Sequence, residues 1–384
     1  MYFDLQPKNR RADLYDFENQ LGQLLELLRG PRARVPLITV IGSRRTGKTS
    51  LVKTALTESG LPHLTLNGMA FAEVPVIKKR SLLLSLEREL NETIEREKGW
   101  GKKLLGVLDG IRWLKVNSKP PFVHFEWKRP KDVDLIDLAY SFNRLARESR
   151  TKFILVLDEA QEFRRLVGYS LQKLMAHIYD NVEGIQMIVT GSQVGFLHDF
   201  LGVDDSESPL YGRGTADIQV PRITRDLAAD FLEKGFKQTK IEPDADVINH
   251  AIEKLDGIIG WLTFFGAKSV ERGSATEEEL DEAIKRGSEL AIKELKNFLM
   301  IRRQASGRYV QILRSARSRH AASWTNLKED LELQEKKHIA NNVFSDLVEN
   351  LVKSNFLQRN ENSTYSIADP LLAHGLRRGY VKLF

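Results

Sequence analysis

Two kinds of hydrophobic pattern alternate along the first 220 or so residues of the chain. Short apolar runs rich in β-branched residues predict buried strands, and apolar residues spaced three and four positions apart predict helices. The predicted strands are residues 35–41, 62–67, 153–159, 185–192 and 215–220. The predicted helices are residues 12–28, 50–59, 133–149 and 169–181. Strands that alternate with helices indicate an α/β domain, in which a parallel sheet has helices on both faces.

Residues 70–130 interrupt this alternation and predict an insertion. Helical periodicity covers about 78–98 and 102–113, and residues 120–127 alternate like an exposed strand or hairpin arm. Aromatic residues and lysines are interleaved here, at Trp100, Trp113, Phe122, Phe125 and Trp127 and at Lys102, Lys103, Lys115, Lys119 and Lys128. Such side chains could stack on single-stranded bases. The favoured alternative is an insertion that covers a small core of its own.

From residue 224 onward the pattern is helical. Four segments predict a small all-α lid domain: residues 224–236, 244–256, 261–272 and 276–300. Three further predicted helices, at about 308–319, 324–334 and 337–354, precede an apolar–turn–apolar stretch over 356–367. Three helices followed by a hairpin indicate a winged helix-turn-helix. The predicted domains are therefore 1–222, with the insertion at about 70–130, then 223–300 and 301–384.

Residues 42–49 form a complete G-x-x-x-x-G-K-[ST] phosphate-binding loop, which follows a predicted strand and opens a predicted helix. Gly42 and Gly47 permit a close backbone approach that side chains would block. The loop amides then point at phosphate oxygens, Lys48 reaches the β- and γ-phosphates, and the Thr49 hydroxyl holds Mg²⁺. A chance glycine-rich turn would not explain this agreement of spacing and context. The predicted nucleotide-binding residues in this segment are Gly42, Ser43, Arg44, Arg45, Thr46, Gly47, Lys48, Thr49 and Ser50.

Two of these residues, Arg44 and Arg45, are bulky for a phosphate loop. We expect their side chains to point to solvent or toward a partner, and we assign them no catalytic role.

An acidic pair, Asp158 and Glu159, ends the apolar run 153–159. Ligands bind at the carboxyl ends of strands in open parallel sheets, so the pair is placed for nucleotide chemistry. Asp158 would hold the Mg²⁺ shell through water, and Glu159 would polarise the attacking water as general base. The alternative is an acid pair at a helix N-terminus, and the phosphate loop upstream makes that alternative less favoured.

The remaining predicted catalytic residues are Ser192 and Arg213, in addition to Lys48 and Glu159. Thr190 and Ser192 end the strand 185–192, beside the expected γ-phosphate, and Ser192 is the predicted water-positioning residue. A strand-end turn would by itself also favour a serine there. Arg213 lies in a glycine-rich loop just before the last strand. It would stabilise transition-state charge as an arginine finger does, and a surface arginine is the equal alternative.

Composition limits the class of protein. The chain has 384 residues, 42% hydrophobic and 29% charged, which is ordinary for a folded protein of two or three domains. No apolar run approaches the roughly 18–20 residues that span a bilayer, and the N-terminus lacks a signal-peptide pattern. The absence of cysteine excludes disulfides, thiol catalysis and cysteine-bound zinc, and favours a cytoplasmic protein with no membrane partner.

The net charge of +6 is concentrated at one end of the chain. Residues 301–384 contain 14 basic and 8 acidic residues, whereas residues 1–300 contain 44 of each. This asymmetry predicts a separate domain with an anionic partner, or alternatively a solvated surface with a modest bias.

Together these features resemble the archaeal ATPase family, in the STAND branch of the AAA+ P-loop proteins. Residues 11–14 resemble the family's first motif, and the resemblance implies that Arg11 lies near the nucleotide base. Residues 190–192 resemble its sensor-1 strand end, and residues 210–213 resemble its arginine-bearing motif. Residues 257–262 resemble its lid motif, with Ile259 where the family usually has proline. The resemblance also implies a C-terminal winged helix.

We therefore predict an ATP-hydrolysing enzyme that uses ATP, ADP and Mg²⁺ and that couples nucleotide state to motion between domains. Its partner could be double-stranded DNA, another protein or a second copy of the chain. The predicted third helix and wing offer only His338, Asn341, Asn342, Lys353 and Arg359, which is thin for reading a DNA groove but compatible with phosphate contacts.

The main alternative is a non-catalytic or very slow nucleotide-dependent switch that acts through protein partners. A small-molecule kinase does not explain a lid followed by a winged helix. GTP is disfavoured because no Asn-Lys-x-Asp element follows the fourth strand.

Overall fold

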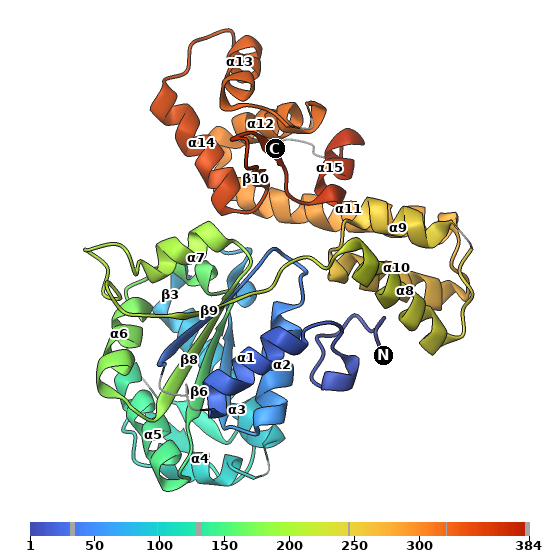
Figure 1. Cartoon of the computed structure of the whole chain (residues 1–384). Helices are drawn as coiled ribbons and strands as arrows, with labels where there is room; N and C mark the ends of the chain where they lie inside the picture. The colour runs from blue at the N-terminus through green and yellow to red at the C-terminus, as the bar shows by residue number, and fades with distance from the viewer. Residues whose placement is uncertain (31–34, 98, 127–132, 245, 320, 381–384) are drawn as a thin grey trace.

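The computed structural model describes residues 1–30, 35–97, 99–126, 133–244, 246–319 and 321–380. Its α/β part is a five-stranded parallel sheet in the order β2-β6-β8-β1-β9 (Figure 1). The strands are β1 (Leu37–Ile41), β2 (His63–Asn67), β6 (Phe153–Asp158), β8 (Ile185–Gly191) and β9 (Ala216–Gln219). All five lie within the predicted segments. Because β8 is inserted between β1 and β6, its carboxyl end lies between the phosphate loop and the acidic pair.

Helices cover both faces of this sheet, as the alternation of the sequence predicts. Ile38 and Val40 of β1 face one core with α1 (Glu18–Arg29) and α2 (Lys48–Ser59). Leu37 and Ile41 face a second core on the other side of the sheet. The helices that contribute to it are α3 (Lys79–Arg96), α4 (Gly101–Leu108), α5 (Leu135–Glu148), α6 (Leu171–Asn181) and α7 (Val194–Leu201). Successive residues of a strand point to opposite faces, so one apolar strand supplies both cores.

Two details of this region differ from prediction. The helix predicted over 12–28 begins only at Glu18, after a separate 3-10 turn over Arg11–Asp13. Helix α7 was not predicted, because its eight residues are too few to establish a helical period. Short elements also lie between the main ones: the 3-10 turns η2 (Gly68–Phe71) and η4 (Ala160–Arg165), and the paired strands β3 (Ile77–Lys78) and β7 (Leu166–Val167).

The inserted segment packs on the second core. Strands β4 (Leu114–Val116) and β5 (Val123–Phe125) form an antiparallel pair. Trp113 and Phe125 are buried, with ring centroids 5.2 Å apart. In the described part of the chain, its buried side chains therefore join the core of the sheet, whereas the favoured prediction was a small core of its own. Trp127 and Lys128 of the same pattern lie outside the described residues.

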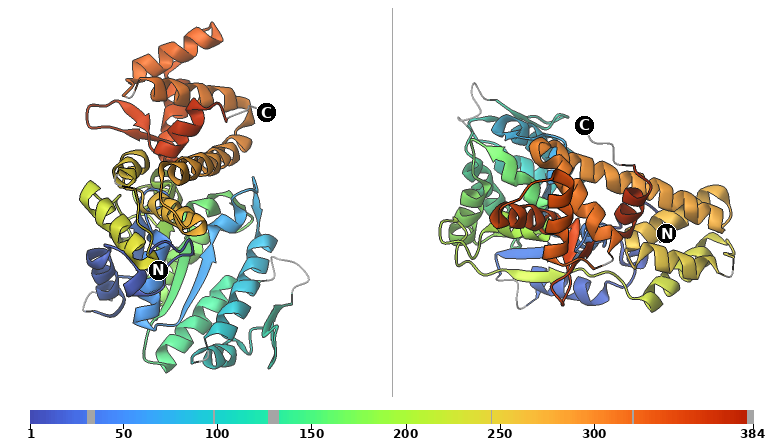
Figure 2. Two further views of the ribbon diagram at one scale, coloured as in Figure 1. Left: turned by 90° about the vertical axis from the view of Figure 1, so that its right-hand side faces the viewer. Right: turned by 90° about the horizontal axis from the view of Figure 1, so that it is seen from above.

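The helical remainder is built around one long helix. Helices α8 (Arg225–Thr239), α9 (Val247–Leu255) and α10 (Ile259–Arg272) lead to α11 (Glu277–Met300), which starts with a Thr276/Glu279 capping box. In Figure 1, α11 runs beneath the C-terminal helices and above the sheet. Figure 2 shows the same stacking from the side and from above.

The C-terminal part continues from α11. Its elements are α12 (Ser306–Ser318), α13 (Trp324–Glu335), α14 (Asn341–Lys353), the hairpin β10 (Leu357–Arg359) and β11 (Tyr365–Ile367), and α15 (Pro370–Arg377). Helix α15 was not predicted, although Asp369 caps it and Pro370 occupies its first turn. It packs along α11, and the apolar side chains from α8 to α15 form one continuous core.

One prediction concerns the N-terminal segment, whose Phe3 is buried against helices α8 and α10. A Cβ added at Gly266 would lie 2.3–2.4 Å from the Phe3 ring, whereas Gly22 of α1 has nothing within 4 Å. We expect Gly266→Ala to lower the free energy of unfolding by about 1–3 kcal/mol through overpacking. We expect Gly22→Ala, on an exposed helix face, to raise it by up to about 1 kcal/mol. Urea unfolding followed by circular dichroism measures both, and equal effects would contradict this packing.

Candidate nucleotide site

The phosphate loop joins β1 to α2 as predicted. A Cβ at Gly42 would lie 2.2 Å from the carbonyl oxygen of Val220. Gly47 has φ +97°, and a Cβ there would lie 2.8 Å from the ring of Phe17. Both positions therefore require glycine. The loop ends at the N-terminus of α2, where free backbone amides and the helix dipole favour an anion.

The first turn of α2 and the carboxyl end of β6 bring the predicted metal ligands together. The Thr49 hydroxyl lies 3.3 and 3.4 Å from the two carboxylate oxygens of Asp158. The Thr190 hydroxyl donates to Asp158 at 2.5 Å and accepts from the backbone amide of Glu159 at 3.0 Å. Thr190 was predicted only as a strand-end residue, and the structure shows that it fixes both acids.

The Glu159 carboxylate is held by two side chains. Its Oε2 atom accepts hydrogen bonds from the Ser192 hydroxyl at 2.5 Å and from the Gln161 amide at 2.7 Å. The Ser192 backbone amide donates to the same oxygen at 3.2 Å. Glu159 also has φ +51°, an unfavourable conformation for a residue with a side chain. The sequence did not predict a role for Gln161, because its only signal is its position two residues after the acidic pair.

Burial and neighbouring charges set the protonation of this site. Burial alone would raise the pKa of Glu159, but Lys48, the hydrogen bonds from Ser192 and Gln161, and Arg44 together bring that pKa below its ordinary value. Burial lowers the pKa of Lys48, and it raises the pKa of Asp158. The Lys48 ammonium donates to the Ser43 carbonyl at 2.6 Å. An ionised Glu159 beside an ammonium suits a base.

Arg44 and Arg45 do not point to solvent, so that expectation was wrong. Arg44 Nη1 lies 2.5 Å from Glu294 Oε2, and Arg45 Nη2 lies 2.5 Å from Glu294 Oε1. Glu294 lies in α11, and its side chain is only 25% exposed. A single carboxylate from the long helix therefore binds two guanidinium groups of the phosphate loop. No sequence pattern connects positions so far apart in the chain.

The lid motif contacts the same loop. The backbone amide of Gly260 donates to the Arg45 carbonyl at 2.9 Å, and the Arg45 guanidinium lies 4.0 Å from the ring centre of Trp261. A Cβ at Gly260 would lie 2.6 Å from Arg45 Cβ. The Trp261 indole donates to Asp369, the residue that caps α15. The loop, the lid and the C-terminal part thus meet at Arg45.

A cavity of about 380 Å³ lies between the N-terminal segment, the phosphate loop and α10. Lys48, Thr49 and Ser50 line its phosphate end, and apolar side chains such as Phe17 and Phe264 line the rest. Arg11 is not part of this lining. Its guanidinium binds Glu18 at 2.6 Å and Glu58 at 2.9 Å, so the structure does not bring it to the expected base site.

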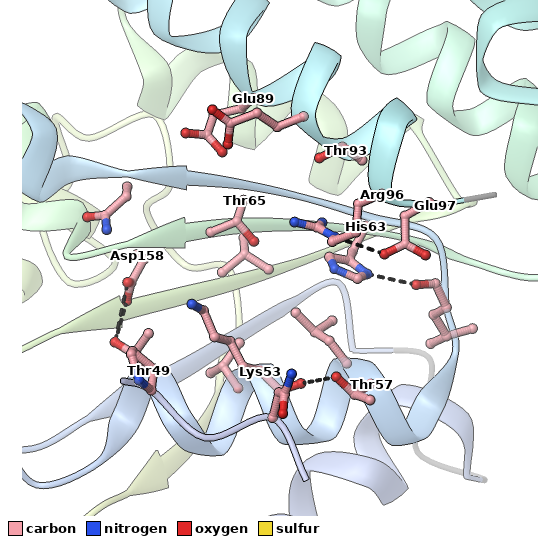
Figure 3. Close-up of a pocket in the computed structure, with 18 of the residues that line it drawn as sticks. Thr49, Lys53, Thr57, His63, Thr65, Glu89, Thr93, Arg96, Glu97 and Asp158 are labelled. Carbon is pink, nitrogen blue, oxygen red and sulfur yellow. Dashed lines mark hydrogen bonds and ion pairs between the residues drawn. The ribbon is translucent and has the colours of Figure 1, made fainter. Parts of the chain in front are cut away.

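A larger cleft of about 720 Å³ approaches the site from the other side, between α2 and α3 above β2 (Figure 3). Its inner end is formed by Thr49 and Asp158, and its outer end by His63, Arg96 and Glu97. The cleft gives water and small molecules a polar route to the acidic pair.

Arg213 is also placed away from the phosphate loop. It binds Asp180 of α6 at 2.5 Å, donates to the Pro209 carbonyl, and lies 5.9 Å from the ring centre of Tyr179. Among the described residues, none of the phosphate loop (42–49) forms a hydrogen bond or ion pair with its guanidinium. The geometry therefore does not bring together the arginine and the phosphate site that the sequence suggested.

Comparison with known proteins agrees with this geometry. A family model described as an ATPase domain predominantly from Archaea matches residues 14–262. The chain belongs to the archaeal ATPase family.

Solved structures extend the comparison over the whole length. The Walker-type ATPase of Pyrococcus abyssi is 32% identical, with a TM-score of 0.81, covering 98% of this chain and 100% of that one. The Aeropyrum pernix ORC2 protein, solved as ADPNP–ADP complexes, is 13% identical, with a TM-score of 0.62, covering 98% of this chain and 95% of that one. Its likeness shows the fold alone. The search of curated proteins returned no match. No helix of the described residues is long and apolar enough to cross a membrane.

One prediction tests the contact between this ATPase domain and α11. Glu294→Gln leaves Arg44 and Arg45 without their carboxylate, and we expect the free energy of unfolding to fall by about 1–3 kcal/mol. The matched control is Glu289→Gln, an exposed glutamate of the same helix, which we expect to change little. Urea unfolding at pH 7 measures the difference, and equal stability of the two variants would contradict the contact.

The same contact predicts a pH dependence. Burial alone would raise the pKa of Glu294, but Arg44 and Arg45 bring it below its ordinary value. A carboxyl group whose pKa is lower in the folded than in the unfolded state stabilises the protein at pH values above its unfolded pKa of about 4.3. This stabilisation is lost as the pH falls through the lower, folded-state pKa. The stability gap between the wild type and Glu294→Gln should therefore be full at neutral pH and shrink below about pH 4.

Proposed function

We propose that this protein binds ATP with Mg²⁺ and hydrolyses it, with Glu159 as general base. The observation that carries the proposal is the position of the Glu159 carboxylate. It lies beside the phosphate loop, its pKa is lowered by Lys48 and by hydrogen bonds, and Ser192 and Gln161 fix its orientation. A base of this kind must be ionised and aimed before it can accept a proton from water.

The residues of the loop fit the nucleotide that this role requires. The glycine positions leave room for phosphate oxygens, and Lys48 is a buried cation at the helix N-terminus. Thr49 and Asp158 place a hydroxyl and a carboxylate side by side, which is an oxygen donor set that suits Mg²⁺. When bound, the ion would neutralise phosphate charge. Thr190 holds Asp158 in place for this purpose.

Ser192 is proposed as a positioning residue. Its hydroxyl donates to Glu159 at 2.5 Å, so it stabilises the ionised carboxylate and limits its rotation. In this arrangement Ser192 acts on water through Glu159.

Nucleotide binding is proposed to be coupled to the long helix. Arg44 and Arg45 belong to the phosphate loop, yet Glu294 holds both. A triphosphate in the loop would compete with Glu294 for these guanidinium groups, because each is drawn to the nearest uncompensated anion. Loss of the contact would free α11, and with it the C-terminal part, to change position.

The C-terminal part is proposed to act as a winged helix that contacts a partner. Helices α12–α14 precede the hairpin, and Ala322 pairs with Tyr365 of β11 by a backbone bridge, which supports that assignment. However, Lys353 of α14 is bound to Asp199 at 3.0 Å. Binding of double-stranded DNA through α14 would need this ion pair to open, so DNA is tested as one candidate partner and a protein or a second copy as the other.

The alternative function is a nucleotide-dependent switch with little or no turnover. The engagement of Glu159 by Ser192 and Gln161 favours it, because a carboxylate that already accepts several hydrogen bonds is a weaker base. The switch hypothesis predicts tight binding of ATP or ADP without hydrolysis.

The first test is steady-state ATP hydrolysis by the purified chain at low salt and elevated temperature, with and without double-stranded DNA. We expect Glu159→Gln to lower kcat about 10²–10⁴-fold while ATP binding persists, because only the base is lost. Glu95→Gln, an exposed residue of α3, is the matched control. ATP binding without turnover by the wild type under every condition would contradict the enzyme and leave the switch. A rate that rises with DNA would identify the partner class.

A second test addresses Ser192. Removing its hydroxyl in Ser192→Ala takes away one of the hydrogen bonds that lower the pKa of Glu159. Since the base works only when ionised, the acidic limb of the pH–kcat profile should move to higher pH, with KM for ATP nearly unchanged. An unshifted limb with a uniformly lower rate would show that Ser192 does not act through Glu159.

A further inference from the structure

A third cavity, of about 410 Å³, lies among η4, α7 and the C-terminal end of α11, and it shares only Arg44 and Glu294 with the residues of the proposed function. Its lining has an excess of positive charge: the charged side chains are Arg44, Arg164, Arg165 and Arg302, with Glu162 and Glu294. Arg164 and Arg165 end the 3-10 turn η4 that follows the acidic pair, and Arg302 lies between α11 and the C-terminal helices. The cavity thus contacts both the sheet domain and the start of the C-terminal part. These are the two parts whose relative position the proposed function couples to nucleotide state.

The two acidic side chains in the lining are already engaged. Glu162 forms an ion pair with Arg165, whose guanidinium also donates to the carbonyl oxygens of Phe71 and Ala72. Glu294 binds Arg44. Among the described residues, neither Arg164 nor Arg302 forms an ion pair with a carboxylate. The cavity therefore contains two guanidinium groups without a direct ion pair, on which carboxylates (Glu162 for both, and Asp199 for Arg164) act only from a longer distance.

These two arginines are also close to each other. The Arg164 guanidinium lies 3.5 Å from the ring centre of Phe196, and that of Arg302 lies 5.5 Å from the same ring. Burial and repulsion from Arg302 lower the pKa of Arg164 to about 10, and burial lowers that of Arg302 as well. Both remain charged at neutral pH. Stacking on phenylalanine holds such groups, but it does not neutralise them.

We propose that this cavity is a second anion site, which binds a phosphate-bearing ligand between Arg164 and Arg302. Guanidinium groups match phosphate oxygens in shape and charge, and a bound anion would remove their mutual repulsion. Gln193, Asn297 and Asn350 in the lining supply neutral amide groups for the remaining oxygens. The bound phosphate would join the helical turn after β6 to the start of the C-terminal part. The site is independent of ATP hydrolysis.

The experiment uses the full chain with its phosphate loop saturated by ADP and Mg²⁺, and pyrophosphate as the probe in isothermal titration. We expect binding by the wild type, and a loss of affinity of about tenfold or more in Arg164→Gln and in Arg302→Gln, because each removes a charge-assisted contact. The matched control is Arg303→Gln, an exposed neighbour outside the lining, which should bind like the wild type. The Lys48→Ala variant should still bind pyrophosphate, which would show that the binding site is not the phosphate loop.

Two results would overturn the site: no pyrophosphate binding by the ADP-saturated wild type, or equal binding by Arg164→Gln, Arg302→Gln and the control. If one arginine variant does not fold, the other decides, since the two residues lie in different parts of the chain. Competition by a short DNA duplex identifies the source of the phosphate. Displacement of pyrophosphate would assign the site to a nucleic-acid backbone, and no displacement would assign it to a small phosphate compound. Failure of ATP hydrolysis would not affect this outcome.

Discussion

The ion pairs between Glu294 and the two arginines of the phosphate loop are the interaction on which the arrangement of this protein depends. They attach the loop to the C-terminal third of α11, whose core is continuous with helices α8–α10 and with the C-terminal helices. Largely buried charges are stable only when they are paired, so neither side can move away without a replacement. In the proposed function, a nucleotide phosphate is that replacement.

A second constraint is the strand order of the sheet. With β8 between β1 and β6, the side chains at its carboxyl end reach both the acidic pair and the space beside the phosphate loop. Thr190 binds Asp158, and Ser192 binds Glu159, so the end of one strand orients both acidic residues together. The positive φ of Glu159 is tolerated because these contacts fix the residue from several sides.

Arginine is used differently at each site of the molecule. Arg44 and Arg45 are neutralised by a carboxylate, whereas Arg164 and Arg302 are held on an aromatic ring without one. Arg213, expected beside the γ-phosphate, is neutralised by Asp180 on the outer side of the sheet domain. Arginines that are already paired with a carboxylate are therefore less available to an anion than those without such a partner.

The sequence alone determined the local parts of this protein: the five strands, most helices, the phosphate loop, and the acidic pair at a strand end. These follow from hydrophobic period and from a motif whose chemistry is contained in eight consecutive residues. Short helices such as α7 and α15 were not predicted, because they span too few residues to show a helical period. Only the tertiary structure decided that Glu294 binds the loop, that Thr190 and Gln161 fix the acids, and that Arg11 and Arg213 are bound elsewhere. Ion pairs depend on which surfaces the packed cores bring together. No pattern along the chain indicates how far apart two distant residues lie in the folded protein.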